Sequence, residues 1–531
     1  MPGCGEEKTH SPAMSQQDQD VVCYYNYLFM ATLLLLPFLL IAMFKPPRKH
    51  SGENLPPGPW RLPVIGSIHH LIGALPHHAM RDLARRYDAP LMLLRLGELN
   101  VVVASSAIAS REIMKTHDAA FATRPRTATL RAITTDDLAI SLAPHGEQWR
   151  RLKKLCVTEV LNTRQVRSLR GCREANAAAL VSSIVSSLSS SSEPVNLSSL
   201  ITTHVTNLAV HALVGERNED LRAEFLECLD EGIKLASGFS LADLFPSSRL
   251  ARAFSSSIRR MEALNNQISQ LIGRIIEEHR MRRSAGGGDE EEDIVDVLLR
   301  IQNDGSLHMP LNARTIGSVI MDMFSGGSET SVTTLQWVMA ELMRSPAALR
   351  RVQAEVRSAF AEQTCIKEDS LQELRYLHLV IRESLRLHPV LPLLLPRECQ
   401  ETCRVLGYDV PEGAMVLVNA WAIGRDIASW GADAEEFRPE RFEEAGDAAA
   451  DFRGTNFELV PFGAGRRMCP GITFGIAVVQ VILASLLFHF DWELPGGGAD
   501  GLDMAEELGM TARRKNDLWL HATVHVPAPN P

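Results

Sequence analysis

Cys469, near the C-terminal end, lies in a segment that suits the binding of a metal through sulfur. The segment Pro461–Gly471 reads PFGAGRRMCPG and has glycines on both sides of the cysteine. Glycines permit a tight turn that aims backbone N–H groups at the sulfur, and such donors stabilise an anionic thiolate and tune its potential. The alternative is a glycine-rich turn that carries an inert cysteine.

An acid and an alcohol stand side by side in a second segment, Gly326–Ser331, which reads GGSETS within an apolar helical stretch, Ile316–Leu342. Each glycine costs about 1 kcal/mol in a helix interior, which indicates that space is needed beside the helix. The neighbours Glu329 and Thr330 form a pair suited to relaying protons. The alternative is a helix kink with a capping threonine.

A second pair, Glu383 and Arg386, lies at a spacing that puts both side chains on one helix face. There a planar guanidinium can bind a carboxylate through two hydrogen bonds. Taken alone, such pairs are usually surface features of little energetic weight.

These segments resemble the motifs of one enzyme family. PFGAGRRMCPG resembles the haem-binding signature of cytochromes P450, F-x-x-G-x-R-x-C-x-G, and ESLR (383–386), FRPERF (437–442) and GGSETS resemble three further motifs of that family. Trp149 and Lys153 resemble its W-x-x-x-[RK] element. The likeness runs from about Leu55 to the end of the chain and is strongest to plant microsomal members. The twenty residues before the apolar N-terminal segment depart from the pattern, so Met14 is an alternative start to Met1.

The resemblance implies a role for each matched residue. Cys469 would be the axial thiolate ligand of haem b iron, which favours O–O cleavage. Thr330 would donate a hydrogen bond to the oxygen being activated, and Glu329 would relay protons to it. The other expected haem-binding residues are Trp149, Lys153, Arg397, Phe462 and Arg467, with Arg467 at a propionate. Glu383, Arg386 and Arg441 would form a buried network that braces the haem loop.

The resemblance further implies a monooxygenase that takes O2 and electrons. Too few residues follow Cys469 for a flavin domain, so the electrons would come from NADPH through a separate NADPH–cytochrome P450 reductase. A docking patch for it could be formed by Arg150, Arg151, Lys153 and Lys154, with Arg466 nearby; a merely solvated helix face is the equal alternative.

The resemblance places the substrate contacts in the segment Arg124–Leu142, at Met323, Phe324 and Gly326 on the glycine-rich helix, at Val390 and Leu394 in Val390–Leu395, and at Met510 in Leu508–Met510. The last three groups are chiefly apolar, which favours a lipophilic small molecule. A plant terpenoid is the first expectation, with phenolic and amino-acid-derived metabolites as alternatives. A haem-thiolate isomerase or dehydratase, and a non-catalytic haem protein, are the alternatives from other classes.

The N-terminal part of the chain indicates where these residues are held. Val21–Phe44 is an uncharged stretch long enough to cross the hydrocarbon core of a membrane. Basic residues follow it and acidic residues precede it, so the positive-inside rule places the bulk of the chain in the cytosol. A cleaved signal peptide and a buried core helix are the alternatives. We therefore predict a single-pass protein of the endoplasmic reticulum membrane with a lumenal tail (1–20), an anchor helix (21–44), a basic, proline-rich hinge (45–59) and a single large catalytic domain (60–531).

The composition of the chain narrows the class of protein and the compartment in which it folds. The 531 residues are 45% hydrophobic and 22% charged, which is typical of a globular protein. A net charge of -10 argues against nucleic-acid binding. Nine scattered cysteines indicate a reducing compartment. Apart from a short strand at Val101–Ala104, apolar residues recur at helical spacing, so the pattern predicts a mainly α fold with small β-sheets, the cytochrome P450 fold. Ser186–Glu193 and Ser284–Asp293 are expected to be surface loops.

Overall fold

The computed structural model describes residues 54–527, with gaps. The gaps lie at 135–138, 191–192, 216–222, 225–226, 229–230, 233–234, 236–239, 285–291, 305–310, 447–449, 499–500, 508 and 510. The predicted lumenal tail, anchor helix and most of the predicted hinge therefore lie outside the described residues, as does Met510.

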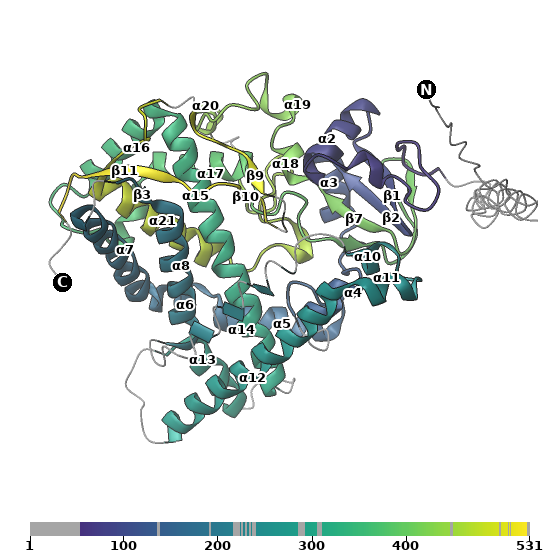
Figure 1. Cartoon of the computed structure of the whole chain (residues 1–531), viewed down its shortest axis with the longest axis horizontal. Coiled ribbons are helices and arrows are strands. Elements are labelled where there is room, and N and C mark those ends of the chain that lie inside the picture. The colour runs from purple at the N-terminus through teal and green to yellow at the C-terminus, as the bar shows by residue number, and fades with distance from the viewer. Residues whose placement is uncertain are drawn as a thin grey trace, which may run out of the picture.

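Helices make up most of the described chain, and the sheets are small, as the sequence predicts (Figure 1). The longer helices are α2 (Pro76–Arg86), α5 (Glu147–Leu155), α7 (Arg170–Ser190), α8 (Leu197–Val214), α12 (Ser256–Ser284), α13 (Ile294–Asp304), α14 (Ala313–Gly327), α15 (Glu329–Arg344), α16 (Pro346–Ala359), α17 (Arg375–Leu387) and α21 (Ile472–His489). The shorter ones are α3 (Ala107–Arg111), α4 (Ala128–Ile133), α6 (Thr163–Ser168), α10 (Leu241–Leu244), α11 (Arg249–Phe254), α18 (Ala420–Ile423), α19 (Ile427–Trp430) and α20 (Arg441–Glu444).

The largest sheet of the described chain has the strand order β1-β2-β7-β4. Its strands are β1 (Leu91–Leu96), β2 (Leu99–Ala104), β7 (Met415–Val418) and β4 (Arg397–Glu398). β1 and β2 form an antiparallel hairpin, and β7 pairs in parallel with β2, with Val103 opposite Leu417. β4 pairs antiparallel with β7. The sheet thereby joins the backbone of Arg397 to a hairpin from the N-terminal part of the chain.

The remaining sheets have two or three strands each. They join β3 (Val195–Asn196), β11 (Trp519–Val524) and β8 (Phe490–Glu493); β5 (Cys403–Val405) and β6 (Tyr408–Val410); and β9 (Glu506–Glu507) and β10 (Arg513–Arg514). The two strands β9 and β10 form an antiparallel pair in which Glu506 is opposite Arg514.

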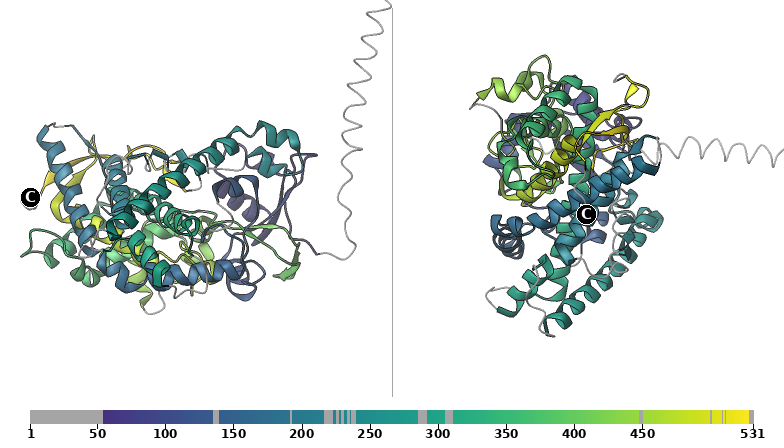
Figure 2. Two further views of the ribbon diagram at one scale, coloured as in Figure 1. Left: turned by 90° about the horizontal axis from the view of Figure 1, so that it is seen from below. Right: turned by 90° about the vertical axis from the view of Figure 1, so that its left-hand side faces the viewer.

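The largest hydrophobic core surrounds α15 and α21. Helices α7, α8, α16 and α17 supply most of its other members. A second core joins α8, α12, α13 and α14. Figure 1 shows α14 and α15 end to end through the middle of the molecule, while α12 runs along its lower edge. In the right-hand view of Figure 2, the teal helices of this lower part and the yellow C-terminal strands lie in different regions of the molecule.

The prediction of a surface loop at Ser186–Glu193 is wrong for its first five residues. Ser186–Ser190 forms the last turn of α7. The hydroxyl groups of Ser186, Ser187 and Ser189 donate to backbone carbonyls four residues earlier, at 2.9, 2.9 and 3.0 Å. Serine side chains that bond to the helix in this way no longer compete with it. Of the second predicted loop, residues 285–291 lie outside the described part of the chain.

Two described helices, α8 and α21, are long and apolar enough to cross a membrane by length and composition alone. Of these helices, 50% of α8 and 61% of α21 are buried inside the fold. Because both belong to the main hydrophobic core, their apolar character is explained by packing within the protein.

Candidate functional site

A cavity opens between the central helices and the loop that carries Cys469. The predicted residues at its wall are Trp149, Lys153, Met323, Gly326, Thr330, Val390, Leu394, Arg397, Phe462, Arg467 and Cys469. They come from α5, α14, α15, β4, the segment after α17 and the loop before α21. The fold thus gathers, around one space, residues from distant parts of the sequence.

The loop before α21 holds Cys469 in a fixed turn. The N–H of Cys469 donates to the carbonyl of Phe462 at 3.0 Å. Gly465 has a φ of +69°, and a Cβ there would lie 2.2 Å from the carbonyl oxygen of Met114 and 2.8 Å from the Asp118 carboxyl group. Only glycine fits this position, because both the backbone angle and the space exclude a side chain.

Cys469 is half-buried, and its thiol lines the cavity. Burial raises the pKa of this thiol, while a backbone hydrogen bond from Gly471 and the charge of Lys153 act in the opposite direction. A protein sulfur in such surroundings is a thiol until a cation binds it, since coordination to a metal removes the proton outright. The turn is therefore suited to an iron ligand more than to a free nucleophile.

Buried positive charge gathers at the same wall. Arg124, Arg397 and Arg467 are 5%, 3% and 8% exposed. Burial lowers the pKa of all three guanidinium groups. For Arg124 and Arg467 the repulsion of neighbouring arginines lowers it further, and the pKa of Arg467 falls to about 9. Burial and Arg467 also lower the pKa of Lys153. Such a cluster is costly unless anions complete it.

These cations are held by few acids and many carbonyl groups. Arg467 donates to the carbonyls of Ala122 (2.6 Å), Ile140 (3.1 Å) and Ala143. Arg397 pairs with Asp118 at 3.4 Å and donates to the Ala464 carbonyl at 3.0 Å. The Lys153 ammonium group donates to the Arg466 carbonyl, and the Trp149 indole donates to the Ile140 carbonyl at 2.9 Å.

The wall of the cavity fits haem. Its surplus of buried cations suits two propionate carboxylates, its one thiol suits the iron, and its remaining surface is mostly apolar. Gly326 is open toward this space, because a Cβ on it would meet nothing within 4 Å. The residues that would hold the group are Cys469 for the iron and Arg124, Arg397, Arg467, Lys153 and Trp149 for its rim.

The central helix is interrupted next to the acid–alcohol pair. Regular helix ends with α14 at Gly327 and resumes with α15 at Glu329, and Ser328 between them has a ψ of -69°. The Thr330 side chain lines the cavity, and its hydroxyl donates to the Gly326 carbonyl at 2.6 Å. This hydroxyl can therefore reach a ligand in the cavity only by leaving or sharing that carbonyl.

Glu329 lies behind the cavity wall and not on it. Its carboxylate pairs with Arg513 and accepts from Thr511 at 3.1 Å and Thr333 at 3.3 Å. Burial raises the pKa of Glu329, with Arg513 acting against the shift. The acid and the alcohol are sequence neighbours, but the carboxylate faces the β9–β10 strands while the hydroxyl faces the cavity.

Glu383 and Arg386 form a buried pair on α17. The Arg386 guanidinium binds the Glu383 carboxylate through two hydrogen bonds of 2.7 and 2.8 Å, and Arg441 donates to the same carboxylate at 2.8 Å. The two arginines continue to the carbonyl groups of Ala434 (2.6 Å) and Glu436 (2.9 and 3.2 Å). The three residues thus tie α17 to the irregular segment that leads toward the cysteine loop.

Phe324 does not reach the cavity, unlike the neighbouring Met323. Its side chain is 2% exposed and packs in the core between α8, α12, α13 and α14. The reason is the helical repeat: Met323, Gly326, Gly327 and Thr330 share the face toward the cavity. Phe324 lies about 100° around the helix from Met323, which turns its side chain into the core.

Two charged residues at the wall have roles that the sequence did not indicate. Arg124, expected only as the end of a substrate-contacting segment, donates to the carbonyls of Ser141 (2.9 Å), Leu395 (2.8 Å) and Pro396 (2.7 Å). Asp322 accepts from the Ile140 N–H and the Ser141 hydroxyl, and burial raises its pKa to about 6. A signal was available for Asp322, because it lies one helical turn before Gly326, on the same face.

The predicted docking patch is divided by the fold. Arg150, Arg151 and Lys154 are exposed on α5, whereas Lys153 is half-buried and turned toward the cysteine loop. Arg151 pairs with Glu147 on the same helix. The outward basic surface therefore consists of fewer residues than the sequence suggested.

Comparison with known proteins extends over nearly the whole chain. The sequence model of the family described as Cytochrome P450 matches residues 56–519. The chain is 45% identical over 501 residues to desmethyl-deoxy-podophyllotoxin synthase of Sinopodophyllum hexandrum, which covers 93% of this chain and 97% of that protein. It is 42% identical to premnaspirodiene oxygenase of Hyoscyamus muticus and to 5-epiaristolochene 1,3-dihydroxylase of Nicotiana tabacum, each over 94% of this chain and 98% of the relative.

Proposed function

Since this chain belongs to the cytochrome P450 family and is a haem-thiolate monooxygenase, we propose that it inserts one oxygen atom of O2 into a lipophilic plant specialised metabolite, a terpenoid in the first place. Two relatives are named as the oxygenase of premnaspirodiene and the dihydroxylase of 5-epiaristolochene, and the endings of these two substrate names denote alkenes. A third relative is named as the synthase of desmethyl-deoxy-podophyllotoxin, a name without that ending. A phenolic substrate is therefore kept as the alternative.

The observation that carries the proposal is the chemistry of the cavity wall away from the cations. There the wall is mostly apolar side chains and glycines, among them Met323, Gly326, Val390, Leu391 and Leu394, although Asp322 and Thr330 also line it. A substrate there would be held by shape and burial with few polar contacts. Hydrocarbon-like molecules meet that requirement better than charged or heavily hydroxylated ones.

The protein's own residues divide the work between them. Haem b, when bound, supplies the oxygen-activating chemistry, and its thiolate ligand favours O–O cleavage. Cys469 would hold the iron, and the buried arginines would hold the carboxylates of the rim. Thr330 would donate a hydrogen bond within the cavity. Glu329, whose carboxylate contacts Arg513 and Thr511, would pass protons from solvent toward Thr330.

Electron supply and location form part of the same proposal. Electrons would come from NADPH through a separate reductase. It would dock at the exposed Arg150, Arg151 and Lys154 of α5, the helix whose Lys153 contacts the cysteine loop. The uncharged segment Val21–Phe44 would anchor the catalytic domain in the endoplasmic reticulum membrane with that domain in the cytosol.

Turnover with labelled dioxygen tests the proposed reaction. The membrane-expressed protein, with reductase and NADPH, is offered terpenoid hydrocarbons and phenolic metabolites in parallel under oxygen of a heavy isotope. We expect one labelled oxygen atom in a terpenoid product. Label only in phenolic products would replace the terpenoid by the alternative, and a converted substrate without label would instead identify an isomerase or dehydratase.

Replacing Thr330 with alanine tests the proposed proton delivery. We expect product formation to fall by about 10²-fold, the weight of one positioned acid–base group, while NADPH oxidation continues and hydrogen peroxide accounts for the difference. Product, NADPH and peroxide are measured together. Ser325→Ala is the matched control, because Ser325 makes the same kind of hydroxyl-to-carbonyl bond on α14, to Met321 at 2.7 Å, but is exposed. Equal coupling in the Thr330→Ala protein and the parent would remove Thr330 from this role.

A further inference from the structure

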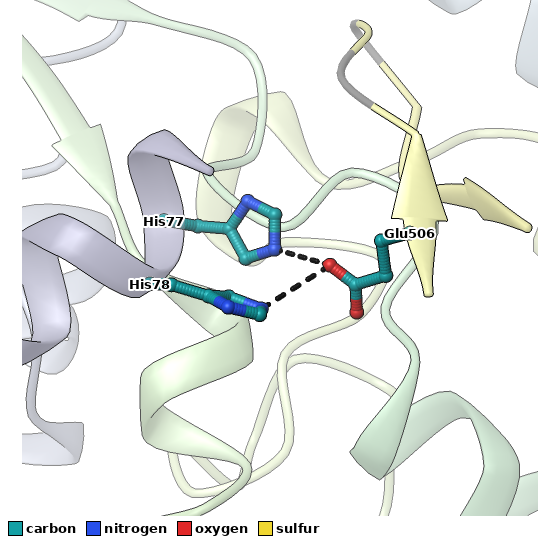
Figure 3. Close-up of side chains that lie close together, drawn as sticks. All are labelled: His77, His78 and Glu506. Atoms are coloured by element: carbon teal, nitrogen blue, oxygen red, sulfur yellow. Dashed lines mark hydrogen bonds and ion pairs between the residues drawn. The ribbon is translucent and has the colours of Figure 1, made fainter. Parts of the chain in front are cut away.

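Two adjacent histidines and a glutamate, none of which lines the cavity of Cys469, meet in a separate cluster (Figure 3). His77 and His78 lie in the first turn of α2, and Glu506 lies in β9, 429 positions beyond His77. The His77 Nε2 and the His78 Nε2 are 2.6 and 3.3 Å from the same Glu506 oxygen, Oε2. Figure 3 shows both imidazole rings turned toward that carboxylate from one side.

His78 is the member whose nitrogen is least satisfied. Its Nε2 is buried and has no partner in good hydrogen-bond geometry among the described residues, although it lies 3.3 Å from Glu506. Two ligands of a tetrahedral metal with bonds of about 2.0–2.1 Å are separated by about 3.3 Å. The His78–Glu506 separation therefore already equals the edge of such a site, and His77 needs to withdraw by less than about 1 Å.

The arginines beside the site are paired with an acid, and one side of the site lies near the surface. Arg81 and Arg425 lie over the Trp421 ring, on which His78 stacks at 4.0 Å. Both arginines pair with Glu435, at 3.1 and 2.9 Å, which offsets their repulsion of a cation. The His78 side chain is 34% exposed, whereas those of His77 and Glu506 are 5% and 6% exposed. The His78 ring is therefore the part of the site nearest to solvent, although its Nε2 itself is buried.

We propose that His77, His78 and Glu506 form a binding site for a divalent transition metal, with Zn²⁺ as the ion of matching ligands and geometry. Two imidazoles and one carboxylate are an established protein ligand set for Zn²⁺, with a fourth position left for water. The ion joins α2 to β9. Because β9 pairs with β10, and Arg513 of β10 pairs with Glu329, it also fixes the strands that hold the buried carboxylate behind the cavity.

Zinc binding to the haem-loaded full-length protein tests the site. After removal of adventitious metal, Zn²⁺ uptake is measured by equilibrium dialysis and metal analysis, and the zinc X-ray absorption edge reports the ligands without interference from iron. We expect one tightly held Zn²⁺ with nitrogen and oxygen ligands near about 2.0–2.1 Å and an upward shift of the thermal midpoint. His78→Gln and Glu506→Gln should each weaken that binding by at least about tenfold.

The controls separate this site from other histidines and from misfolding. The adjacent pair His69 and His70 lies in the short helix Ile68–His70, with ring centroids 3.9 Å apart. Their ring nitrogens meet the carbonyl groups of Gly66 and Trp60, at 3.0 and 3.1 Å, where the proposed site has a carboxylate. The His69→Gln, His70→Gln double variant should therefore bind Zn²⁺ like the parent. The reduced, CO-bound spectrum verifies that each variant still holds haem. Unchanged affinity in His78→Gln, or sulfur ligands at the zinc edge, would overturn the proposal.

Discussion

Replacing Cys469 with serine is expected to abolish monooxygenase activity. The substitution changes one atom, so the turn held by the Cys469 N–H and the Phe462 carbonyl should survive. A serine hydroxyl, however, has a much higher pKa than a thiol and is a hard ligand that cannot replace a soft thiolate at the iron. The reduced, CO-bound absorption spectrum is the measurement, and we expect the red-shifted haem band of a thiolate ligand to disappear.

Cys365→Ser is the matched control for this experiment. Cys365 is half-buried and does not line the cavity, so the same exchange of sulfur for oxygen should leave the spectrum and the product yield as in the parent. A red-shifted band that persisted in Cys469→Ser would assign the axial ligand to another residue. It would also end the interpretation of the loop 461–471 as the iron-binding turn.

Parts of the candidate site were predictable because they are local in the sequence. The turn around Cys469 needs glycine at Gly465, and the Glu383–Arg386 pair needs only one helical turn; both are short patterns with a physical reason. The small sheets among many helices also follow from the periodicity of apolar residues. These predictions did not depend on knowing which distant segments meet.

What the sequence could not supply is the contact between distant segments. Asp322 meets Ile140 and Ser141, and Glu506 meets His77, through packing that no local pattern encodes. The helical serines of α7 show a second limit. Composition alone predicts a loop for Ser186–Ser190, whereas the tertiary packing of α7 overrides the low helix propensity of serine.

The pair on α17 has the second large expected effect. In Glu383→Gln the shape of the side chain is kept but its charge is lost, and the guanidinium groups of Arg386 and Arg441 remain buried, at 1% and 7% exposure. Removing one partner of a buried ion pair leaves an uncompensated charge and costs about 3–5 kcal/mol. We expect the free energy of unfolding to fall by this amount, and the yield of haem-loaded protein to fall with it.

A pair of the same residue types at the same spacing provides the comparison. Glu277 and Arg280 are also three residues apart and 2.7 Å from each other, but their side chains are 60% and 43% exposed. Because solvent screens exposed pairs, Glu277→Gln should cost less than about 1 kcal/mol. Denaturant titration of the parent and both variants, followed by the haem band and by tryptophan fluorescence, measures the difference. If Glu383→Gln were as mild as Glu277→Gln, the arginines would be satisfied by the carbonyl groups of Ala434 and Glu436 alone, and Glu383 would not be what holds the segment before the cysteine loop.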